Sequence, residues 1–270
     1  ILIVLFIKQP ALPEMWNGFG TKYEPGPIFP MMFISIACGA ISGFHATQSP
    51  LMARCIKNER HGRPVFYGAM IVEGIVALIW AAAATAFFER HGTDFTAAQV
   101  VDFICKDWLG VIGGILAVLG VIAAPITSGD TAMRSARLIL ADMLKMEQKS
   151  ISKRLLLCAP LFAASLGLLI FSIMNNDGFT IIWRYFSWCN QTLSVFTLWA
   201  ITVYLVLEKK NYFVTLIPAL FMTCVVTTYI CIAPEGFRMN ETIAYIIGGA
   251  ATITAIVWFA GWKKKNETTL

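Results

Sequence analysis

Long apolar stretches alternate with short polar segments along the chain. Hydropathy predicts a partial membrane-spanning helix at 1–7 and full ones at 28–49, 64–88, 109–127, 154–174, 181–207, 212–233 and 241–262. A helix needs about 20 mainly apolar residues to cross a bilayer, and each full segment is near that length. The pattern therefore predicts an all-α polytopic membrane protein with seven full transmembrane helices and a partial one at the start.

The composition excludes several other classes of protein. Of the 270 residues, 57% are hydrophobic and 14% are charged, and the mean hydropathy is +0.69. A soluble domain carries roughly 25% charged residues, so this chain is too poor in charge for a cytosolic enzyme, a disordered protein or a nucleic-acid-binding protein. The seven cysteines show no regular pairing, which argues against a disulfide framework or a metal site.

Lysine and arginine are distributed unevenly between the connections. Fifteen of the 21 basic residues lie in 54–63, 128–154, 208–211 or the segment after 262, and these connections alternate with poorer ones. By the positive-inside rule the rich connections lie in the cytoplasm, so we expect an inner (plasma) membrane protein whose C-terminus is cytoplasmic. The net charge of +5 reflects this bias and implies no nucleic-acid partner.

Two of the connections have a helical periodicity of their own. Residues 94–108 place apolar side chains near one face, which predicts a short external amphipathic helix. Residues 131–146 also have one apolar face. This second stretch either continues the preceding span or lies on the inner membrane surface, and periodicity does not distinguish the two.

A polar motif interrupts the 28–49 span. The sequence Ser-Gly-Phe-His-Ala-Thr-Gln-Ser-Pro occupies 42–50 and sets polar groups beside a glycine and a proline. Unwound backbone at membrane depth is tolerated only where it faces protein or water, and broken helices carry the substrate sites of secondary transporters. The alternative is a simple Gly/Pro kink with the histidine bonded to a neighbouring helix. The motif predicts a substrate site formed by Ser42, Gly43, His45, Thr47 and Gln48.

Hydroxyl groups at the inner end of another span predict an ion site. Ala124, Thr127 and Ser128 share a helix face, and one carbonyl with two hydroxyls suits a small cation such as Na⁺. Serine and threonine also bond back to the preceding turn, which leaves a purely local role open. Asp130 is either a proton-coupling candidate or the partner of Arg134 in a local ion pair.

Glu73 lies deep in the 64–88 span. At 1.5 Å per residue it is roughly 13 Å from the start of that span, where a carboxylate is costly. We expect it to face the protein interior with a partner such as His45, since histidine is the residue type that titrates near neutral pH. Glu73 is a second proton-coupling candidate. The alternative is a structural hydrogen bond from a protonated carboxyl group to a neighbouring helix.

Three segments resemble a family of bacterial transporters, the carbon starvation protein A (CstA) family. The resemblance is carried by Ser-Gly-Phe-His-Ala-Thr-Gln-Ser-Pro-Leu-Met-Ala-Arg-Cys at 42–55, by Gly-Arg-Pro-Val-Phe-Tyr-Gly-Ala-Met-Ile-Val-Glu-Gly at 62–74 and by Ile-Thr-Ser-Gly-Asp-Thr-Ala-Met-Arg-Ser-Ala-Arg at 126–137. It implies ion-coupled uptake of peptides or pyruvate in cells short of carbon. With this function we expect no enzymatic activity and no cofactor beyond the coupling ion, Na⁺ or H⁺.

The family is similar to the amino acid–polyamine–organocation superfamily, whose core is two inverted five-helix repeats. By this resemblance, residues 1–27 are the end of a truncated helix and an external loop. Residues 28–207 are the second repeat, with 94–108 as its external helix, and residues 208–270 are two trailing helices and a basic tail. The expected partners are the substrate, membrane lipid and an N-terminal repeat that this chain lacks.

The resemblance also implies where the fourth predicted span ends. The span from 109 continues to about residue 145, and Ala124, Thr127 and Ser128 match the positions that help hold sodium in sodium-driven members of the superfamily. The other half of that ion site belongs to the first repeat.

Two other classes of function stay open on the sequence. A membrane-embedded enzyme would use His45 and Glu73 as an acid–base or metal pair, although no HExxH or GxSxG motif supports it. A seven-helix receptor or sensor would bind a ligand without translocating it, and the polar break inside a span argues against it. Metal analysis and uptake measurements separate both from a symporter.

Overall fold

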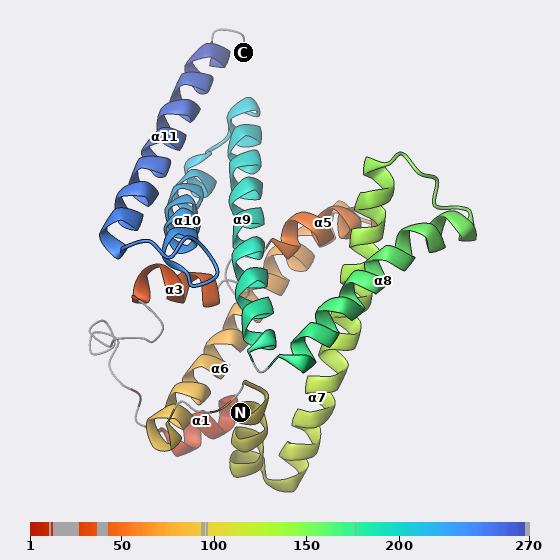
Figure 1. Ribbon diagram of the computed structural model, residues 1–270, viewed down its shortest axis with the longest axis vertical. Helices are drawn as coiled ribbons and strands as arrows, with labels where there is room; N and C mark the ends of the chain where they lie inside the picture. Colours follow the sequence, from red (N-terminus) through yellow and green to blue (C-terminus); the bar gives the residue numbers. More distant parts are fainter. Residues whose placement is uncertain are drawn as a thin grey trace. The chain divides into compact units, whose positions relative to one another are not determined.

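The computed structural model describes residues 1–10, 12, 27–36, 43–92, 95, 97–175 and 177–267. Every regular element in this part is helical (Figure 1). Six helices in it are long and apolar enough to cross a membrane: Glu59–His91, Gln99–Gly120, Ile151–Met174, Gly178–Leu207, Phe213–Ile232 and Glu241–Asn266. The protein is therefore a multi-pass membrane protein whose described elements are all helical.

These helices correspond to six of the seven predicted spans. The remaining prediction, 28–49, includes residues 37–42, which lie outside the described residues. Its described ends are two shorter helices, α3 (Ile28–Ser35) and α5 (Phe44–Cys55). The count of seven and the inverted-repeat arrangement therefore stay predictions.

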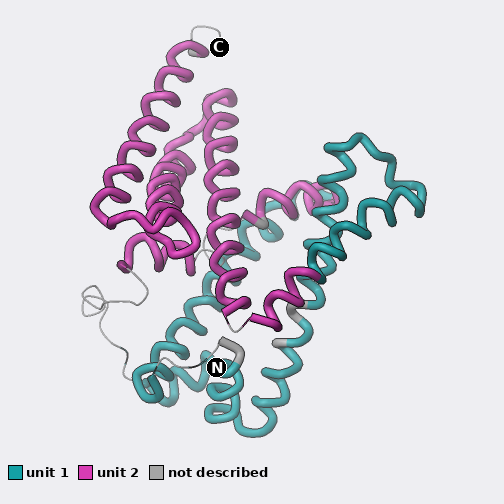
Figure 2. Tube along the Cα trace, in the orientation of Figure 1, with its two compact units in different colours: residues 1–20, 58–166 teal, residues 21–57, 167–270 magenta. Residues whose placement is uncertain are grey.

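The chain divides into two compact units, which Figure 2 colours separately. Unit 1 comprises residues 1–20 and 58–166, and unit 2 comprises residues 21–57 and 167–270. The second boundary falls inside α8 (Ile151–Met174). Each unit has a hydrophobic core of its own.

Unit 1 contains α1 (Leu2–Lys8), two short helices, η1 (Glu59–His61) and η2 (Arg63–Gly68), then α6 (Ala69–His91), α7 (Ala97–Met143) and the first part of α8. Its core forms where Ala83 and Phe87 of α6 pack against Val100 and Ile104 of α7. The small Ala83 side chain lets the two helices approach closely, as is usual between membrane helices. Large apolar side chains elsewhere on these helices are exposed, as expected for surfaces that face lipid.

Gly110 divides α7 into two arms. Its φ of 68° and ψ of −157° are far from helical values, and only glycine adopts this conformation without strain. Figure 1 shows that α7 bends sharply between its two arms. The turn lies two residues beyond the predicted 94–108 helix, of which residues 94 and 96 lie outside the described part. The second arm continues to Met143, near the predicted end at 145.

Unit 2 contains the end of α8, then α3, α5, α9 (Gly178–Leu207), α10 (Phe213–Ile232) and α11 (Glu241–Glu267). Helix α10 packs against α9, α11 and α3. Met31 and Ile34 of α3 fill the core against apolar residues of α10, among them Met222, Val225 and Val226. Hydroxyl and indole groups also tie α9 to α10, since Trp199 Nε1 donates to Thr223 Oγ1 (3.1 Å) and Thr202 Oγ1 donates to Thr215 Oγ1 (2.8 Å).

Candidate functional site

Most of the predicted substrate motif lies on α5 in unit 2. Gly43 is buried and immediately precedes the helix, whereas His45, Thr47 and Gln48 are half-buried on it. Ser42, the fifth predicted residue, lies outside the described residues. The described part of the motif is therefore half-buried or buried, and its role in substrate binding stays a prediction.

The predicted unwinding of this motif is wrong for its second part. The backbone is helical from Phe44 to Cys55, with Pro50 inside the helix. Proline removes one hydrogen-bond donor, and here that leaves only the Ala46 carbonyl without its helical partner. One missing bond does not unwind a helix that neighbouring helices support.

The start of α5 touches the backbone of α9. A β-carbon built on Gly43 would lie 2.5 Å from the carbonyl oxygen of Asn190 and 2.8 Å from Cβ of Leu193. Both distances are too short for any residue with a side chain. The predicted motif is thus anchored against the middle of α9 by a contact that requires glycine.

Buried polar side chains lie on α9 at this contact. Asn190, Gln191 and Ser194 are buried, and Gln191 is 0% exposed. Ser194 Oγ donates to the Gln191 backbone oxygen (2.7 Å) and to Gln191 Oε1 (3.2 Å). Buried polar groups are costly in a membrane protein unless they are partnered, so a cluster of them marks a structural or binding role. We call the polar residues of the α5 motif and the buried Asn190, which Gly43 contacts, the α5–α9 patch.

The predicted ion-site residues lie on the second arm of α7 in unit 1. Thr127 and Ser128 are exposed, and the side chain of Ala124 lies outside the described part. Thr127 Oγ1 donates to the Ala123 carbonyl oxygen (3.2 Å), which is the bond back to the preceding turn that the sequence left open. Within unit 1 these oxygens face outward.

Asp130 forms the local ion pair that the sequence offered as its alternative role. Arg134 Nη2 lies 2.7 Å from Asp130 Oδ2, and both side chains are largely exposed. An exposed pair one helical turn apart contributes little to stability, about 0.3–0.5 kcal/mol.

Glu73 is exposed on α6 in unit 1. The expectation that it faces the interior is therefore not met by the described part of the chain. The residues that bury a core on α6 are Ala83 and Phe87, farther along the helix. Its proposed partner His45 belongs to unit 2, and the pairing of the two stays a prediction.

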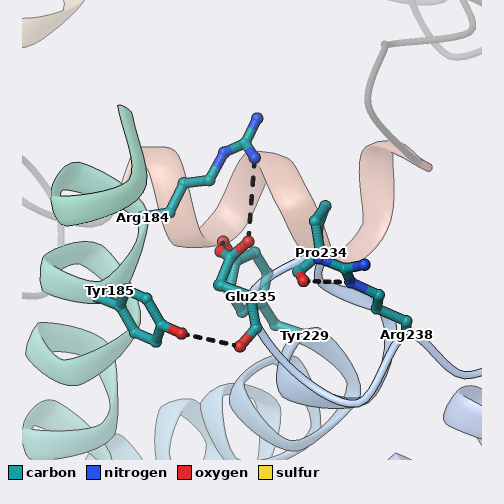
Figure 3. Close-up of polar contacts among 6 residues, drawn as sticks. All are labelled: Arg184, Tyr185, Tyr229, Pro234, Glu235 and Arg238. Atoms are coloured by element: carbon teal, nitrogen blue, oxygen red, sulfur yellow. Dashed lines mark hydrogen bonds and ion pairs between the residues drawn. The ribbon is translucent and has the colours of Figure 1, made fainter. Parts of the chain in front are cut away.

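A cluster of ionisable residues in unit 2 was missed from the sequence (Figure 3). Glu235, in the connection between α10 and α11, has a side chain only 6% exposed. The Tyr229 hydroxyl donates to Glu235 Oε1, and Arg184 Nη1 lies 4.0 Å from Oε2. The Tyr185 hydroxyl donates to the Glu235 backbone oxygen (3.1 Å). Glu235 thus joins the connection to α9 and α10.

The cluster borders a groove of about 690 Å³. Glu235 and Asp177 line it together with Arg184 and Arg238, so its acidic and basic groups balance. Glu235 Oε2 is buried and has no hydrogen-bond partner among the described residues. A groove with both kinds of charge suits a ligand that carries a carboxylate and an ammonium group.

Glu235 was missed because it sits at the end of a span. A glutamate that follows Ala-Pro at the end of a predicted span cannot be told from an ordinary loop residue by its sequence context. The sequence feature that could have pointed to this cluster is the polar pair Arg184 and Tyr185 inside the apolar 181–207 segment. Among the described residues, no group of three or more His, Cys, Asp or Glu side chains is arranged to hold a metal ion.

Comparison with known proteins identifies related sequences. The model of the family "Carbon starvation protein CstA" matches residues 1–107 and 92–229. An uncharacterized protein of Haemophilus influenzae is 46% identical over 128 residues, which is 47% of this chain and 88% of that protein.

Other relatives carry functional names. The pyruvate/proton symporter BtsT of Escherichia coli is 41% identical over 80 residues, which is 29% of this chain and 11% of BtsT. The peptide transporter CstA of Helicobacter pylori is 27% identical over 206 residues, 73% of this chain and 27% of that protein. The chain thus spans only about a quarter of that transporter's length. No solved structure matches.

Proposed function

Because the chain belongs to the carbon starvation protein CstA family, we propose that it forms part of a secondary transporter for peptides or pyruvate in the plasma membrane. Its named relatives are transporters rather than enzymes, and one of them is a proton symporter. The family name refers to carbon starvation, so we propose that this uptake serves cells short of carbon.

The α5–α9 patch carries this proposal. In a membrane protein, polar side chains inside a helix bundle are costly and are retained mainly for binding or for helix association. Here the half-buried His45, Thr47 and Gln48 lie on the helix whose start contacts the buried Asn190 of α9. We propose that these side chains, with Ser42 and Gly43, contribute hydrogen bonds to the substrate.

Ion coupling is a second part of the proposal. For Na⁺ the proposed ligands are the Ala124 carbonyl and the Thr127 and Ser128 hydroxyls. For H⁺ the proposed carriers are Glu73 and Asp130. The outward orientation of Thr127, Ser128 and Glu73 within unit 1 is compatible with ligands supplied by the rest of a longer protein.

The test is uptake by the full-length protein in vesicles. Radiolabelled pyruvate and radiolabelled dialanine are offered in turn, with an imposed Na⁺ gradient, an imposed H⁺ gradient or neither. Uptake of one substrate above that of protein-free vesicles is expected, and a gradient should increase it. Specific binding of a substrate without any uptake would instead indicate a receptor.

Two variants test the ion assignment. Thr127→Ala with Ser128→Ala is expected to abolish Na⁺ stimulation, and Thr254→Ala is the matched control. Thr254 on α11 is also exposed and donates to the carbonyl four residues earlier. Thr254→Ala therefore removes the same kind of local hydrogen bond without changing the proposed ion site. Unchanged Na⁺ dependence in the double variant would remove the Na⁺ site from the proposal.

A further variant tests the proton assignment. Glu73→Gln is expected to flatten the pH dependence of uptake, whereas Glu89→Gln, near the exposed end of the same helix, is expected to leave it intact. A normal pH profile for Glu73→Gln would exclude Glu73 as the proton carrier.

A further inference from the structure

A groove rich in arginine lies between α7 and α8 in unit 1, apart from the residues assigned above to substrate. It measures about 420 Å³. Arg134 and Arg137 of α7 line it on one side, and Arg154 of α8 lines it on the other. Asp130 is its acidic residue, so the groove carries a net charge of +2.

Two of the three guanidinium groups have no acceptor among the described residues. Arg134 is paired with Asp130. Arg137 and Arg154 form no ion pair or side-chain hydrogen bond within the described part of the chain, and Arg137 Nε is buried there without a partner. A buried N–H group without an acceptor is unfavourable, so the groove is better suited to an anion than to water alone.

The shape of the anion follows from the donors. Two guanidinium groups that face one groove offer several N–H donors in fixed planes, an arrangement that matches the oxygens of a phosphate. One face of a phosphate can accept from both groups at once. A net charge of +2 also suits a phosphate better than a single carboxylate.

The position in the membrane protein points to the source of this phosphate. Arg154 is in the first turn of a candidate span, Ile151–Met174, so the groove lies at a membrane boundary. Beyond it, α8 presents exposed apolar side chains, including Leu155 at 63%, Phe162 at 58% and Leu166 at 57%. Phe162 also lines the groove itself. A molecule that joins a phosphate to apolar chains fits both surfaces.

We propose that this groove binds the phosphate headgroup of an anionic phospholipid, with the acyl chains along the exposed face of α8. Arg137 and Arg154 hold the phosphate oxygens, and Arg134 is kept in place by Asp130. This lipid site is independent of the transport proposal, because it involves neither the α5–α9 patch nor a coupling ion.

The experiment measures lipid retained by the purified full-length protein. The protein is reconstituted with equal amounts of phosphatidylglycerol and phosphatidylcholine, extracted gently, and examined by native mass spectrometry. Preferential retention of phosphatidylglycerol is expected. The double variant Arg137→Gln, Arg154→Gln is expected to lower this preference about tenfold or more, since each basic residue near an anionic membrane surface contributes about fivefold to binding.

Arg60→Gln is the matched control. Arg60 is an exposed basic residue of unit 1 on the same predicted side of the membrane, and it does not line the groove. An equal loss of preference in Arg60→Gln and in the double variant would mean that general surface charge, not a site, retains the lipid, and would overturn the proposal.

A competition arm separates lipid from free phosphate. Inorganic phosphate at millimolar concentration is expected to leave phosphatidylglycerol bound, because it lacks the contribution of the acyl chains. Complete displacement of the lipid by inorganic phosphate would show that the groove is a site for soluble phosphate, and would overturn the lipid assignment.

Discussion

At the residue scale, the contact between Gly43 and Asn190 explains why glycine stands where α5 begins. The Asn190 carbonyl oxygen would lie 2.5 Å from any β-carbon at this position. A larger residue must therefore push α5 away from α9. Since the polar side chains of the α5–α9 patch belong to both helices, such a shift changes the patch as well as the packing.

Gly43→Ala is expected to destabilise the protein by about 1–3 kcal/mol, the usual range for overpacking a well-packed interface. It is also expected to reduce uptake more than the loss of folded protein explains. Thermal unfolding in detergent and uptake per folded molecule measure the two effects.

Gly249→Ala supplies the control, because a β-carbon at Gly249 meets nothing within 4 Å in the described structure. Alanine in place of glycine at an open helix position is expected to raise the free energy of unfolding by up to about 1 kcal/mol. If Gly43→Ala behaved like Gly249→Ala in both measurements, the close contact would not exist in the protein.

Glu235 and Arg184 form the second informative pair at this scale. Removal of Arg184 leaves a buried carboxylate without its counter-charge, whereas removal of both charges leaves only neutral groups. We therefore expect Arg184→Gln to lower the free energy of unfolding more than the double variant with Glu235→Gln. A coupling energy of about 0.5–3 kcal/mol is the usual range for residues in one network.

Chemical unfolding of the four members of this double-mutant cycle measures the coupling. Additive effects of the two single variants would show that Arg184 and Glu235 do not interact, and that the Tyr229 and Tyr185 hydrogen bonds alone hold the connection.

Sequence reasoning located candidate residues better than it located their partners. The motif at 42–50 was found because polar residues are conspicuous in an apolar segment. Its neighbour Asn190 was not assigned to the same patch, because the two are far apart in the chain and only the packing of α5 on α9 joins them. Glu235 was missed for the opposite reason, since an acid near a helix end is not conspicuous.

At the scale of elements, length and hydropathy predicted most of the helices. Six predicted spans have helical counterparts, because a long apolar segment in a membrane has few other ways to satisfy its backbone. Local irregularities were predicted less well. The glycine and proline of the α5 motif suggested unwinding, whereas helix α5 continues through Pro50.

Gly110 is an element-scale feature that can be tested directly. Its φ of 68° is accessible to glycine and strained for alanine. Gly110→Ala is expected to destabilise the turn between the two arms of α7 by about 1–3 kcal/mol. Thermal unfolding measures the effect.

Gly120→Ala is the control within the same helix, since Gly120 is not among the residues of positive φ and has open space around it. It is expected to be neutral or slightly stabilising. Equal stability of the two variants would show that α7 passes through residue 110 without the turn.

At the scale of the whole molecule, the distribution of basic residues makes a prediction about orientation. The connections richest in lysine and arginine, and the tail after 262, are expected in the cytoplasm. Green fluorescent protein fused after Leu270 is expected to fluoresce, because it folds in the cytoplasm. Alkaline phosphatase fused after Arg238, in the preceding connection, is expected to be active outside.

Fluorescent and enzymatic reporters give opposite readings, so each is the control for the other. An active phosphatase after Leu270 together with an inactive one after Arg238 would show that the orientation is the opposite of the predicted one. The arginine groove would then lie at the outer membrane surface, although its binding chemistry would be unchanged.

The contact at Gly43 also restricts how the protein can move. Because α5 meets the α9 backbone with no side chain between them, a shear of α5 along α9 would bring a β-carbon against the Asn190 carbonyl. In the proposed transport cycle, the start of α5 and the middle of α9 are therefore expected to move together as one rigid body. A movement that opens the α5–α9 patch in that cycle is then expected to come from other helices.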